Sequence, residues 1–428
     1  MNLPGSPFLA RDAAGTLTLE GHALAGLAHE FATPLYVYSR QAMRAAVTAY
    51  QQALAGRPHL VCYAMKANSS LAVLQTFAEA GCGFDIVSAG ELQRVLAAGG
   101  SADQVVFSGV GKTRAEMRLA LEAGVRCFNV ESEAELDVLS EVATAMGKTA
   151  PISLRVNPDV DAKTHPYIST GLKGNKFGIS HEHALAVYQH AARLPGIAVH
   201  GIDCHIGSQI TEISPYLDAL DRVLDLVEAI EAAGIPVHHL DLGGGLGITY
   251  TDEQPPTADA LIGALLAKID ARGHGHREIL MEPGRSLVGN AGVLLTEVLY
   301  LKPGEQKNFC IVDAAMNDMA RPAMYEAWMG IVPCQQRDDT TQTWDVVGPV
   351  CESGDWLGRD RALAVQPGDT LAMLSAGAYG MTMASNYNSR PRAAEVMVDG
   401  AQVTLIRARE TVESLFAGER LIDGHSRL

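Results

Sequence analysis

Short apolar runs alternate with longer alanine- and leucine-rich stretches from Leu35 to Arg285 of this 428-residue chain. Short apolar runs predict buried strands, and the longer stretches have the apolar spacing of helices. The predicted strands cover Leu60 to Lys66, Cys82 to Val87, Val105 to Ser108, Cys127 to Val130, Ile152 to Val156, Val199 to His205, His239 to Leu242 and Ile279 to Glu282. The helical stretches between them include Leu71 to Ala80, Glu91 to Ala98, Ala115 to Ala123, Glu133 to Ala145, Glu182 to Arg193, Tyr216 to Ala233 and Ala258 to Ala271. Eight strands with interposed helices favour a TIM-like (β/α)8 barrel over an open sheet.

Beyond Arg285 the pattern changes to strands without long helices between them, which is typical of a β-domain. These strands cover Val293 to Leu301, Phe309 to Val312, Trp344 to Val350, Thr370 to Leu374, Ala394 to Val398 and Gln402 to Arg407, and a short helix is expected over Glu410 to Leu421. The strand-like run Thr16 to Leu19 could pair with this domain. The sequence therefore predicts an α/β fold with a barrel over residues 36–284 and a β-sandwich or β-barrel domain from residues 1–35 and 285–428.

Charge and cysteine usage narrow the partners and the compartment. The formal charge of −16 disfavours nucleic acids and anionic membranes and favours a small-molecule substrate. No apolar run approaches the roughly 20 residues of a membrane span, and the start of the chain lacks the pattern of a signal peptide. Seven cysteines without a C-x-x-C pair fit free thiols better than disulfides or a zinc site. These features predict a cytoplasmic protein.

Lys66 is the most informative residue, because it ends the first predicted strand and is followed by Ala67 and Asn68. At the rim of a core, desolvation lowers the pKa of an amine and makes it nucleophilic, as a Schiff-base lysine requires. A strand-end lysine is more often solvated or paired, so this residue alone leaves both interpretations open.

Polar or glycine residues occur at several other strand ends, where barrel enzymes place their sites. Asp85 falls in the second strand, His205 ends the sixth, Gly243 to Gly245 follow the seventh, and Glu282 ends the eighth. The glycine run offers backbone N–H groups that can wrap a phosphate, and Ser208 offers a hydroxyl. A tight turn explains the glycines equally well, and the spacing does not match a G-x-G-x-x-G dinucleotide motif.

The segment Glu282-Pro-Gly-Arg285 has an ordinary and a chemical interpretation. A salt-bridged turn is the ordinary one. In a lysine-imine enzyme, a carboxylate beside the pyridine nitrogen of pyridoxal phosphate keeps that nitrogen protonated and the ring electron-withdrawing. His205 would be either a core histidine or an aromatic ring lying against the cofactor.

Two loops of the β-domain carry further candidates. Cys351 stands beside Glu352, and Tyr379 lies between small residues, although each alone is compatible with ordinary packing. Paired histidines occur at His181/His183, His238/His239 and His274/His276. They lack companion cysteines or clustered carboxylates, so no metal site is predicted.

Together these motifs resemble one family. They are Tyr63-Ala-Met-Lys66-Ala-Asn68, Gly83-Phe-Asp85-Ile-Val-Ser88, His205-Ile-Gly-Ser208-Gln209, Gly243-Gly-Gly245, Glu282-Pro-Gly-Arg285, Cys351-Glu352-Ser353 and Gly377-Ala-Tyr379-Gly380. In this order, across nearly the whole chain, they resemble diaminopimelate decarboxylase, in the alanine-racemase-like class (fold type III) of pyridoxal-phosphate enzymes. The resemblance implies a head-to-tail homodimer with shared active sites. It also implies decarboxylation of meso-2,6-diaminopimelate to L-lysine and CO2, the last step of lysine biosynthesis.

The resemblance also implies a role for each matching residue. Lys66 would hold the cofactor as an imine, His205 would stack on the ring, Glu282 would face the pyridine nitrogen, and Cys351 would protonate the α-carbon. The implied cofactor-binding set is Lys66, Asp85, His205, Ser208, Gly243, Gly244, Gly245, Glu282, Gly284, Arg285 and Tyr379. The implied substrate-binding set is Arg285, Arg321, Tyr325, Glu352 and Tyr379.

This set suits a substrate with an amino acid group at each end. Arg321 would hold the distal carboxylate and Glu352 the distal ammonium. A buried Arg321 would be a liability in an ornithine or lysine decarboxylase, whose substrate has no distal carboxylate. The run from His165 to Gly171 and on to Gly178 also resembles the family's specificity loop, which closes over substrate.

Three alternatives remain open. A pyridoxal-phosphate decarboxylase of another basic amino acid or polyamine precursor (ornithine, lysine, arginine or carboxynorspermidine) is the nearest. An alanine racemase would share Lys66 but uses arginine where this chain has Glu282. A non-catalytic paralogue would need neither of these residues nor Cys351.

Overall fold

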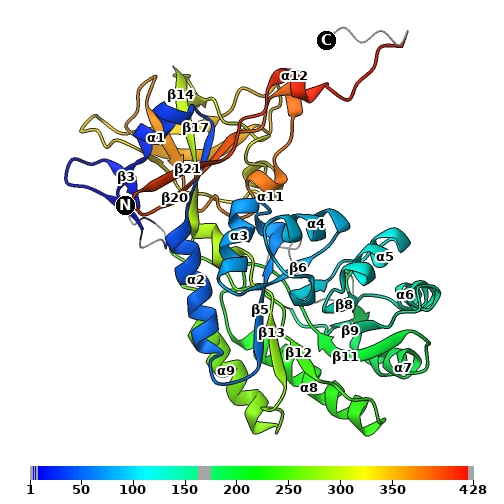
Figure 1. The fold of residues 1–428 in the computed structure, drawn as a ribbon. Helices are drawn as coiled ribbons and strands as arrows, with labels where there is room; N and C mark the ends of the chain where they lie inside the picture. Colours follow the sequence, from blue (N-terminus) through cyan, green and yellow to red (C-terminus); the bar gives the residue numbers. More distant parts are fainter. Residues whose placement is uncertain (1–2, 4, 6–7, 162–174, 423–428) are drawn as a thin grey trace. The chain divides into compact units, whose positions relative to one another are not determined.

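The computed structural model describes residues 3, 5, 8–161 and 175–422, which form two compact units (Figure 1). One unit is Met43–Val288, and the other combines Met1–Ala42 with Gly289–Leu428. We call them the barrel unit and the β-unit.

Eight parallel strands close the barrel unit on itself. They are β5 (His59–Ala64), β6 (Gly83–Ile86), β7 (Val105–Phe107), β8 (Cys127–Val130), β9 (Ala150–Asn157), β11 (Ile197–Asp203), β12 (His239–Asp241) and β13 (Glu278–Met281). Each pairs with the next in this order, and β13 returns to β5 through the pairs Ile279–His59, Leu280–Leu60 and Met281–Val61. The short β10 (Ile179–Ser180) adds beside β9. The predicted TIM-like barrel is confirmed, and the predicted strands agree with the observed ones to within two residues at each end.

Helices follow the strands around the barrel (Figure 1). They are α2 (Arg40–Ala53), α3 (Leu71–Glu79), α4 (Ala89–Ala97), α5 (Arg114–Ala123), α6 (Glu133–Ala145), α7 (His181–Ala191), α8 (Ser214–Ala232), α9 (Ala258–Ala271) and the short α10 (Arg285–Val288). Local sequence sets several boundaries: Thr113 and Glu116 form a reciprocal capping box at the start of α5, and Gly124 ends that helix in the left-handed conformation. Each long helix buries one apolar stripe, as the sequence pattern predicts.

The β-unit contains a small sheet and a large one. Strands β1 (Leu9–Arg11), β2 (Leu17–Leu19) and β3 (His22–Ala23) form the small sheet, and α1 (Leu24–Phe31) follows. The large sheet contains β4 (Leu35–Ser39), β14 (Gly292–Lys302), β15 (Phe309–Val312), β16 (Ile331–Pro333), β17 (Gln342–Val347), β18 (Trp356–Leu363), β19 (Thr370–Met373), β20 (Ala394–Asp399) and β21 (Gln402–Arg407). Short helices α11 (Arg321–Tyr325) and α12 (Val412–Leu415) complete the unit.

Three features of the β-unit differ from or refine the sequence prediction. The N-terminal run does pair with this unit, through the bridge between Thr16 and Gln335. Strand β18 was not predicted, because charged residues interrupt its apolar pattern. The expected tail helix shrinks to the four residues of α12. Among the described residues, no helix combines the length and the apolar character that a bilayer crossing needs.

A series of three hydrogen-bonded polar side chains is buried in the barrel interior. His239 Nε2 lies 2.8 Å from Ser153 Oγ, which lies 3.3 Å from Cys127 Sγ. A Cβ at Gly201 would come within 2.2 Å of His239 Nε2, so the imidazole occupies space that only glycine leaves open. Burial lowers the pKa of His239 to about 3, with help from the positive charge of Arg126. This histidine is therefore neutral at physiological pH.

Acid should destabilise the fold through His239. Its pKa is about 3 in the folded protein and about 6.5 in an unfolded chain, so the unfolded state binds more protons between these values. Stability is therefore lost as pH falls below about 6.5, by about 2–3 kcal/mol from this group at pH 4.5. Urea unfolding at pH 7.5 and 4.5 measures this loss. Between the two pH values, the free energy of unfolding of His239→Gln should fall by about 2–3 kcal/mol less than that of wild type. The same change at exposed His276 is the control, and equal losses in wild type and His239→Gln would refute the assignment.

Candidate active site at the carboxyl end of the barrel

Lys66 lies just beyond β5, in the single 3-10 turn Met65–Ala67. Its Nζ donates to Asp85 Oδ2 at 2.8 Å. The Asp85 side chain on β6 is fully buried, whereas 38% of the Lys66 side chain is exposed. The predicted lysine is therefore at the rim of the barrel, reachable from solvent and held by a buried carboxylate.

The glycine run after β12 passes through spaces that no side chain could share. Gly243 and Gly245 have φ values of +65° and +96°. An added Cβ would approach the Cys204 carbonyl oxygen at 2.6 Å from Gly243, the Glu282 carbonyl oxygen at 2.0 Å from Gly244, and the Gly207 carbonyl oxygen at 2.3 Å from Gly245. Both conformation and close approach thus require glycine here.

Two N–H groups of this run are engaged by neighbouring side chains. Gly243 N–H donates to Asp241 Oδ1 at 3.0 Å, and Gly244 N–H donates to His205 Nδ1 at 3.1 Å. Because Nδ1 accepts a hydrogen bond, the His205 ring is neutral and carries its proton on Nε2. Burial, with the positive charges of Arg155 and Lys66, holds the pKa of His205 well below its usual value. The N–H of Gly245 is therefore the one in this run that suits a phosphate.

Ser208 and Arg285 form a cationic corner next to the run. Arg285 is buried, and its guanidinium donates to Ser208 Oγ at 3.0 Å and to Tyr250 Oη at 2.6 Å. A hydroxyl and a positive charge held together in this way suit an anionic group. Ser208 and Arg285 are recognisable from the sequence, whereas Tyr250 has no distinguishing signal there.

The Glu282 turn is locked to both the glycine run and the lysine strand. Glu282 N–H donates to the Gly243 carbonyl at 2.7 Å, and Ala64 N–H donates to the Pro283 carbonyl at 3.0 Å. The Glu282 side chain accepts from Asn129 Nδ2 at 3.2 Å. A Cβ on Gly284 would lie 3.2 Å from the Cβ of Ala67, so glycine lets this turn pack closely against the Lys66 turn.

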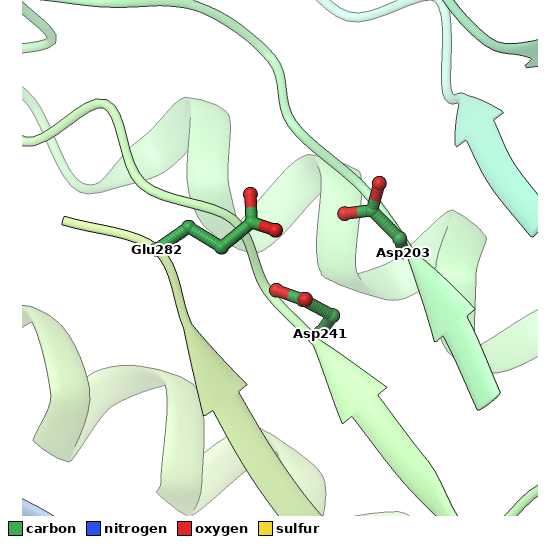
Figure 2. Close-up of side chains that lie close together, drawn as sticks. All are labelled: Asp203, Asp241 and Glu282. Atoms are coloured by element: carbon green, nitrogen blue, oxygen red, sulfur yellow. The ribbon is translucent and has the colours of Figure 1, made fainter. Parts of the chain in front are cut away.

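Two carboxyl groups that the sequence analysis missed accompany Glu282. Figure 2 shows Asp203, Asp241 and Glu282 pointing toward one another from the ends of neighbouring strands. Their side chains are buried, and one oxygen from each lies within 4.8 Å of the others. Two ionised carboxylates about 4 Å apart repel by about 4 kcal/mol at an effective dielectric constant of about 20. Burial raises the pKa of Asp241 to about 6. Burial and the negative charges of Asp241, Asp85 and Asp203 hold the pKa of Glu282 well above its usual value.

Arg155 on β9 compensates part of this negative charge. Although burial alone disfavours a charged guanidinium, the fields of Glu131, Asp203 and Glu282 raise the pKa of Arg155. Its Nη1 donates to Glu131 Oε1 at 3.3 Å. Among the described residues, the Arg155 guanidinium acts in this way on Asp203 and the Lys66 amine on Glu282.

The geometry of the three carboxyl oxygens would also accommodate a metal ion. The sequence analysis found no carboxylate cluster, so the structure adds one, and the expectation of no metal stays a prediction. The residues fit pyridoxal phosphate better in type: an amine at the rim, a glycine cradle beside a cationic corner, and a buried acid for a ring nitrogen.

The β-unit holds the remaining predicted residues. Arg321 is buried at the start of α11, with its Nη1 3.9 Å from Met329 Sδ, and Tyr325 ends that helix partly buried. Cys351 and Glu352 are exposed in the loop after β17. There Cys351 N–H donates to Asn388 Oδ1 at 2.9 Å, and Glu352 Oε2 accepts from Tyr387 at 3.1 Å.

Asp355 connects the Cys351 loop to the segment that leads to Arg321. Its two oxygens accept from Val350 N–H at 2.8 Å and Met316 N–H at 2.6 Å. Tyr379 follows β19 with a φ of +56°. The structure thus places the predicted residues in two sets, one on each unit.

Part of the predicted specificity loop, His165 to Gly171, lies outside the described residues. Its described end is anchored, since Gly178 N–H donates to Glu131 Oε2 at 3.1 Å and the Phe177 ring lies 4.9 Å from the Arg155 guanidinium. Arg155, Glu131 and Asn129 were not singled out in the sequence. Polar residues at the ends of otherwise apolar strands were the signal that would have found them, together with Asp203 and Asp241.

Comparisons with known proteins agree with this geometry. A family model described as the pyridoxal binding domain of pyridoxal-dependent decarboxylases matches residues 40–289. Diaminopimelate decarboxylase of Pseudomonas aeruginosa is 59% identical, covering 97% of this chain and 99% of its own length. The enzyme of Vibrio cholerae is 56% identical over 95% and 97% of the two chains. The crystal structure of diaminopimelate decarboxylase from M. jannaschii, in complex with L-lysine, superposes with a TM-score of 0.94 at 39% identity, over 98% and 99% of the two chains.

Gly244→Ala should disrupt the site, because its Cβ would lie 2.0 Å from the Glu282 carbonyl oxygen. Overpacking of this kind costs about 1–3 kcal/mol, and cofactor affinity should fall with it. Gly263→Ala in α9 is the matched control, since nothing lies within 4 Å of its added Cβ. It should raise stability by about 0.5–1 kcal/mol. Urea unfolding and cofactor titration measure both effects, and a fully stable Gly244→Ala protein with normal affinity would contradict the described packing.

Proposed function

The chain belongs to the diaminopimelate decarboxylases, and on that premise we propose which of its residues carry out the decarboxylation of meso-2,6-diaminopimelate to L-lysine and CO2. The protein is a carboxy-lyase of lysine biosynthesis that uses pyridoxal phosphate. The observation that carries the assignment of residues is the meeting of Lys66, the glycine run and Glu282 at one end of the barrel.

In our proposal the barrel unit binds the cofactor. The amine of Lys66 attaches it covalently, and Asp85 holds that amine in place. The phosphate binds to Gly245 N–H, Ser208 and Arg285, while Gly243, Gly244 and Gly284 leave the backbone room that these contacts need. His205 would lie against the ring as a neutral imidazole, Glu282 would face the ring nitrogen, and Tyr379 would add a further contact. When bound, pyridoxal phosphate supplies the electron sink for the negative charge left by the departing carboxyl group.

The β-unit carries the proton donor and substrate selection in this proposal. The Cys351 thiol gives a proton to the substrate α-carbon, in the place the carboxyl group leaves. Support comes from its position in an exposed loop whose backbone is held by Asn388 and Asp355. The distal carboxylate of the substrate pairs with Arg321 and its distal ammonium with Glu352. Arg285, Tyr325 and Tyr379 complete the substrate contacts.

We propose further that the protein is a cytoplasmic homodimer with shared active sites, without nucleic-acid or membrane partners. All seven cysteines are free thiols, which suits a reducing compartment. The net charge of −16 disfavours binding to polyanions. Most of the cofactor set lies on the barrel unit and most of the substrate set on the β-unit, with Arg285 and Tyr379 belonging to both sets. This division is compatible with sites completed by a second subunit. The proposed domain limits are residues 36–284 for the cofactor-binding barrel and 1–35 with 285–428 for the β-domain.

Substrate choice should depend on Arg321. Wild-type protein should release CO2 from meso-diaminopimelate and far less from L-lysine, L-ornithine or L-arginine, which lack the distal carboxylate. Arg321→Ala should lose about 2–5 kcal/mol in kcat/KM for meso-diaminopimelate, the usual cost of truncating one member of a buried charged pair. Arg337→Ala is the control, because this β-unit arginine pairs with Asp369 and lies outside the proposed site. Equal kinetics of Arg321→Ala and wild type would remove Arg321 from the substrate pocket.

Hybrid dimers test the shared site. If Lys66 and Cys351 of one site come from different subunits, Lys66→Ala and Cys351→Ala proteins are each nearly inactive. A mixed dimer then has one site with both defects and one with neither. Random reassortment makes about half the dimers mixed, so activity should recover to about a quarter of wild type. Tagged subunits mixed in mild denaturant verify the hybrids, and verified hybrids as inactive as their parents would show that each site lies within one chain.

A further inference from the structure

Asp241 and Glu282 are held by the same glycine. Gly243 donates its N–H to Asp241 Oδ1 at 3.0 Å and accepts the N–H of Glu282 on its carbonyl at 2.7 Å. The two carboxyl groups are thereby fixed next to each other at the ends of adjacent strands (Figure 2). The backbone fixes where the two side chains begin, and the hydrogen bonds from Gly243 to Asp241 and from Asn129 to Glu282 hold their carboxyl groups.

Hydrogen bonding around the pair is incomplete if both groups are ionised. Asp241 Oδ2 and Asp203 Oδ1 are buried and have no donor among the described residues. Buried carboxylate oxygens without donors are costly, and a proton on a neighbouring carboxyl supplies a donor. A protonated Glu282 beside Asp241 satisfies this need, while Asn129 still donates to its other oxygen.

The charged groups at this end of the barrel also favour a protonated carboxyl. Among the described residues, the buried carboxyls at this end of the barrel include Asp85 on β6, Glu131 after β8, Asp203 on β11, Asp241 on β12 and Glu282 after β13. The described cations at the same end include Arg155, which binds Glu131, Lys66, which binds Asp85, and Arg285, which binds Ser208 and Tyr250. His205 is neutral, and the buried Cys62 thiol keeps its proton because burial and these carboxylates raise its pKa. A proton shared within the cluster reduces the excess of negative charge.

We propose that Asp241 is a positioning residue that shares one proton with Glu282 in the cofactor-free protein, and that this proton passes to the ring nitrogen of pyridoxal phosphate on binding. One O–H bond of Glu282 breaks and one N–H bond forms, so the site gains a cationic ring beside an ionised Glu282 without exchanging a proton with solvent. The inference rests on the proposed place of Glu282 at the ring nitrogen.

The proposal predicts the number of protons taken up on cofactor binding. If the charge of Asp241 is what keeps the proton on Glu282, then Glu282 in Asp241→Asn is ionised before the cofactor binds and has no proton to give to the ring nitrogen. Calorimetric titration of cofactor-free protein with pyridoxal phosphate, in two buffers of different ionisation enthalpy, measures this count. The variant should take up about one proton per site more than wild type. Glu135→Gln is the matched control: it removes a buried barrel carboxyl, which pairs with Lys112, and should leave the count unchanged.

A second measurement detects the carboxyl proton itself. The infrared difference spectrum between cofactor-bound and cofactor-free wild type should show loss of a protonated-carboxyl band, and Glu282→Gln should lack this loss. No band in wild type, or equal proton counts in wild type and folded Asp241→Asn, would overturn the proposal. A divalent ion in cofactor-free wild type that is missing from Asp241→Asn would overturn it as well.

Failure of the inference is separable from failure of the proposed function. With ¹⁵N-labelled cofactor, nuclear magnetic resonance reports the protonation of the ring nitrogen directly. If the nitrogen remains protonated in Glu282→Gln, the assigned role of Glu282 is wrong. If Glu282→Gln loses that proton while Asp241→Asn matches wild type in every measurement, only the sharing with Asp241 is wrong.

Discussion

Closure of the barrel between β13 and β5 is the constraint on which the site depends. Lys66 lies just beyond the first strand and Glu282 just beyond the last, more than 200 residues apart in sequence. Their pairing in parallel register, extended by the hydrogen bond from Ala64 to Pro283, brings both strand ends to the same rim. The close packing of Gly284 against the Lys66 turn depends on the same register. A shift of one residue would move these side chains to the other face of the strand.

The barrel contains two kinds of buried charge, and the difference between them is informative. The Lys112 side chain is fully buried, and its amine has a full set of hydrogen-bond acceptors. It donates to Glu135 and to the carbonyls of Gly109 and Asn129, each at 2.8 Å. Asp203, Asp241 and Glu282 lie in an equally buried place without a matching set of donors. Buried carboxylate oxygens that lack hydrogen-bond donors destabilise a fold. They are expected at functional sites, where a ligand supplies the missing interaction. The first group stabilises the fold, whereas the second is suited to a ligand that brings positive charge.

Much of the barrel was predictable because its strands are short apolar runs and its helices are long and amphipathic. Lys66, His205 and Glu282 were singled out because they stand at predicted strand ends, and the motif resemblance, not the position of each residue alone, assigned them roles. Asp203 and Asp241 stand at equivalent strand ends, but a single aspartate after an apolar run is also an ordinary surface residue. Only the closed barrel shows that they point inward and share space with Glu282. In the β-unit, the charges of Arg359 to Arg361 concealed β18, and no local signal showed that Leu35–Ser39 pairs with β14 and β20.

The distribution of residues between the two units separates two chemical tasks. In the barrel unit, strand register and the glycine backbone fix the positions of the charged and hydrogen-bonding groups. Such fixed positions suit a cofactor, because the cofactor is the same in every turnover. The β-unit presents its residues on a five-residue helix and on loops held at a few points, such as the two hydrogen bonds of Asp355. Loops of this kind change with less cost to the fold than strand ends do. Selection among substrates that share an α-amino acid group is therefore expected to reside in Arg321, Glu352 and their supports, while the cofactor chemistry stays with the barrel.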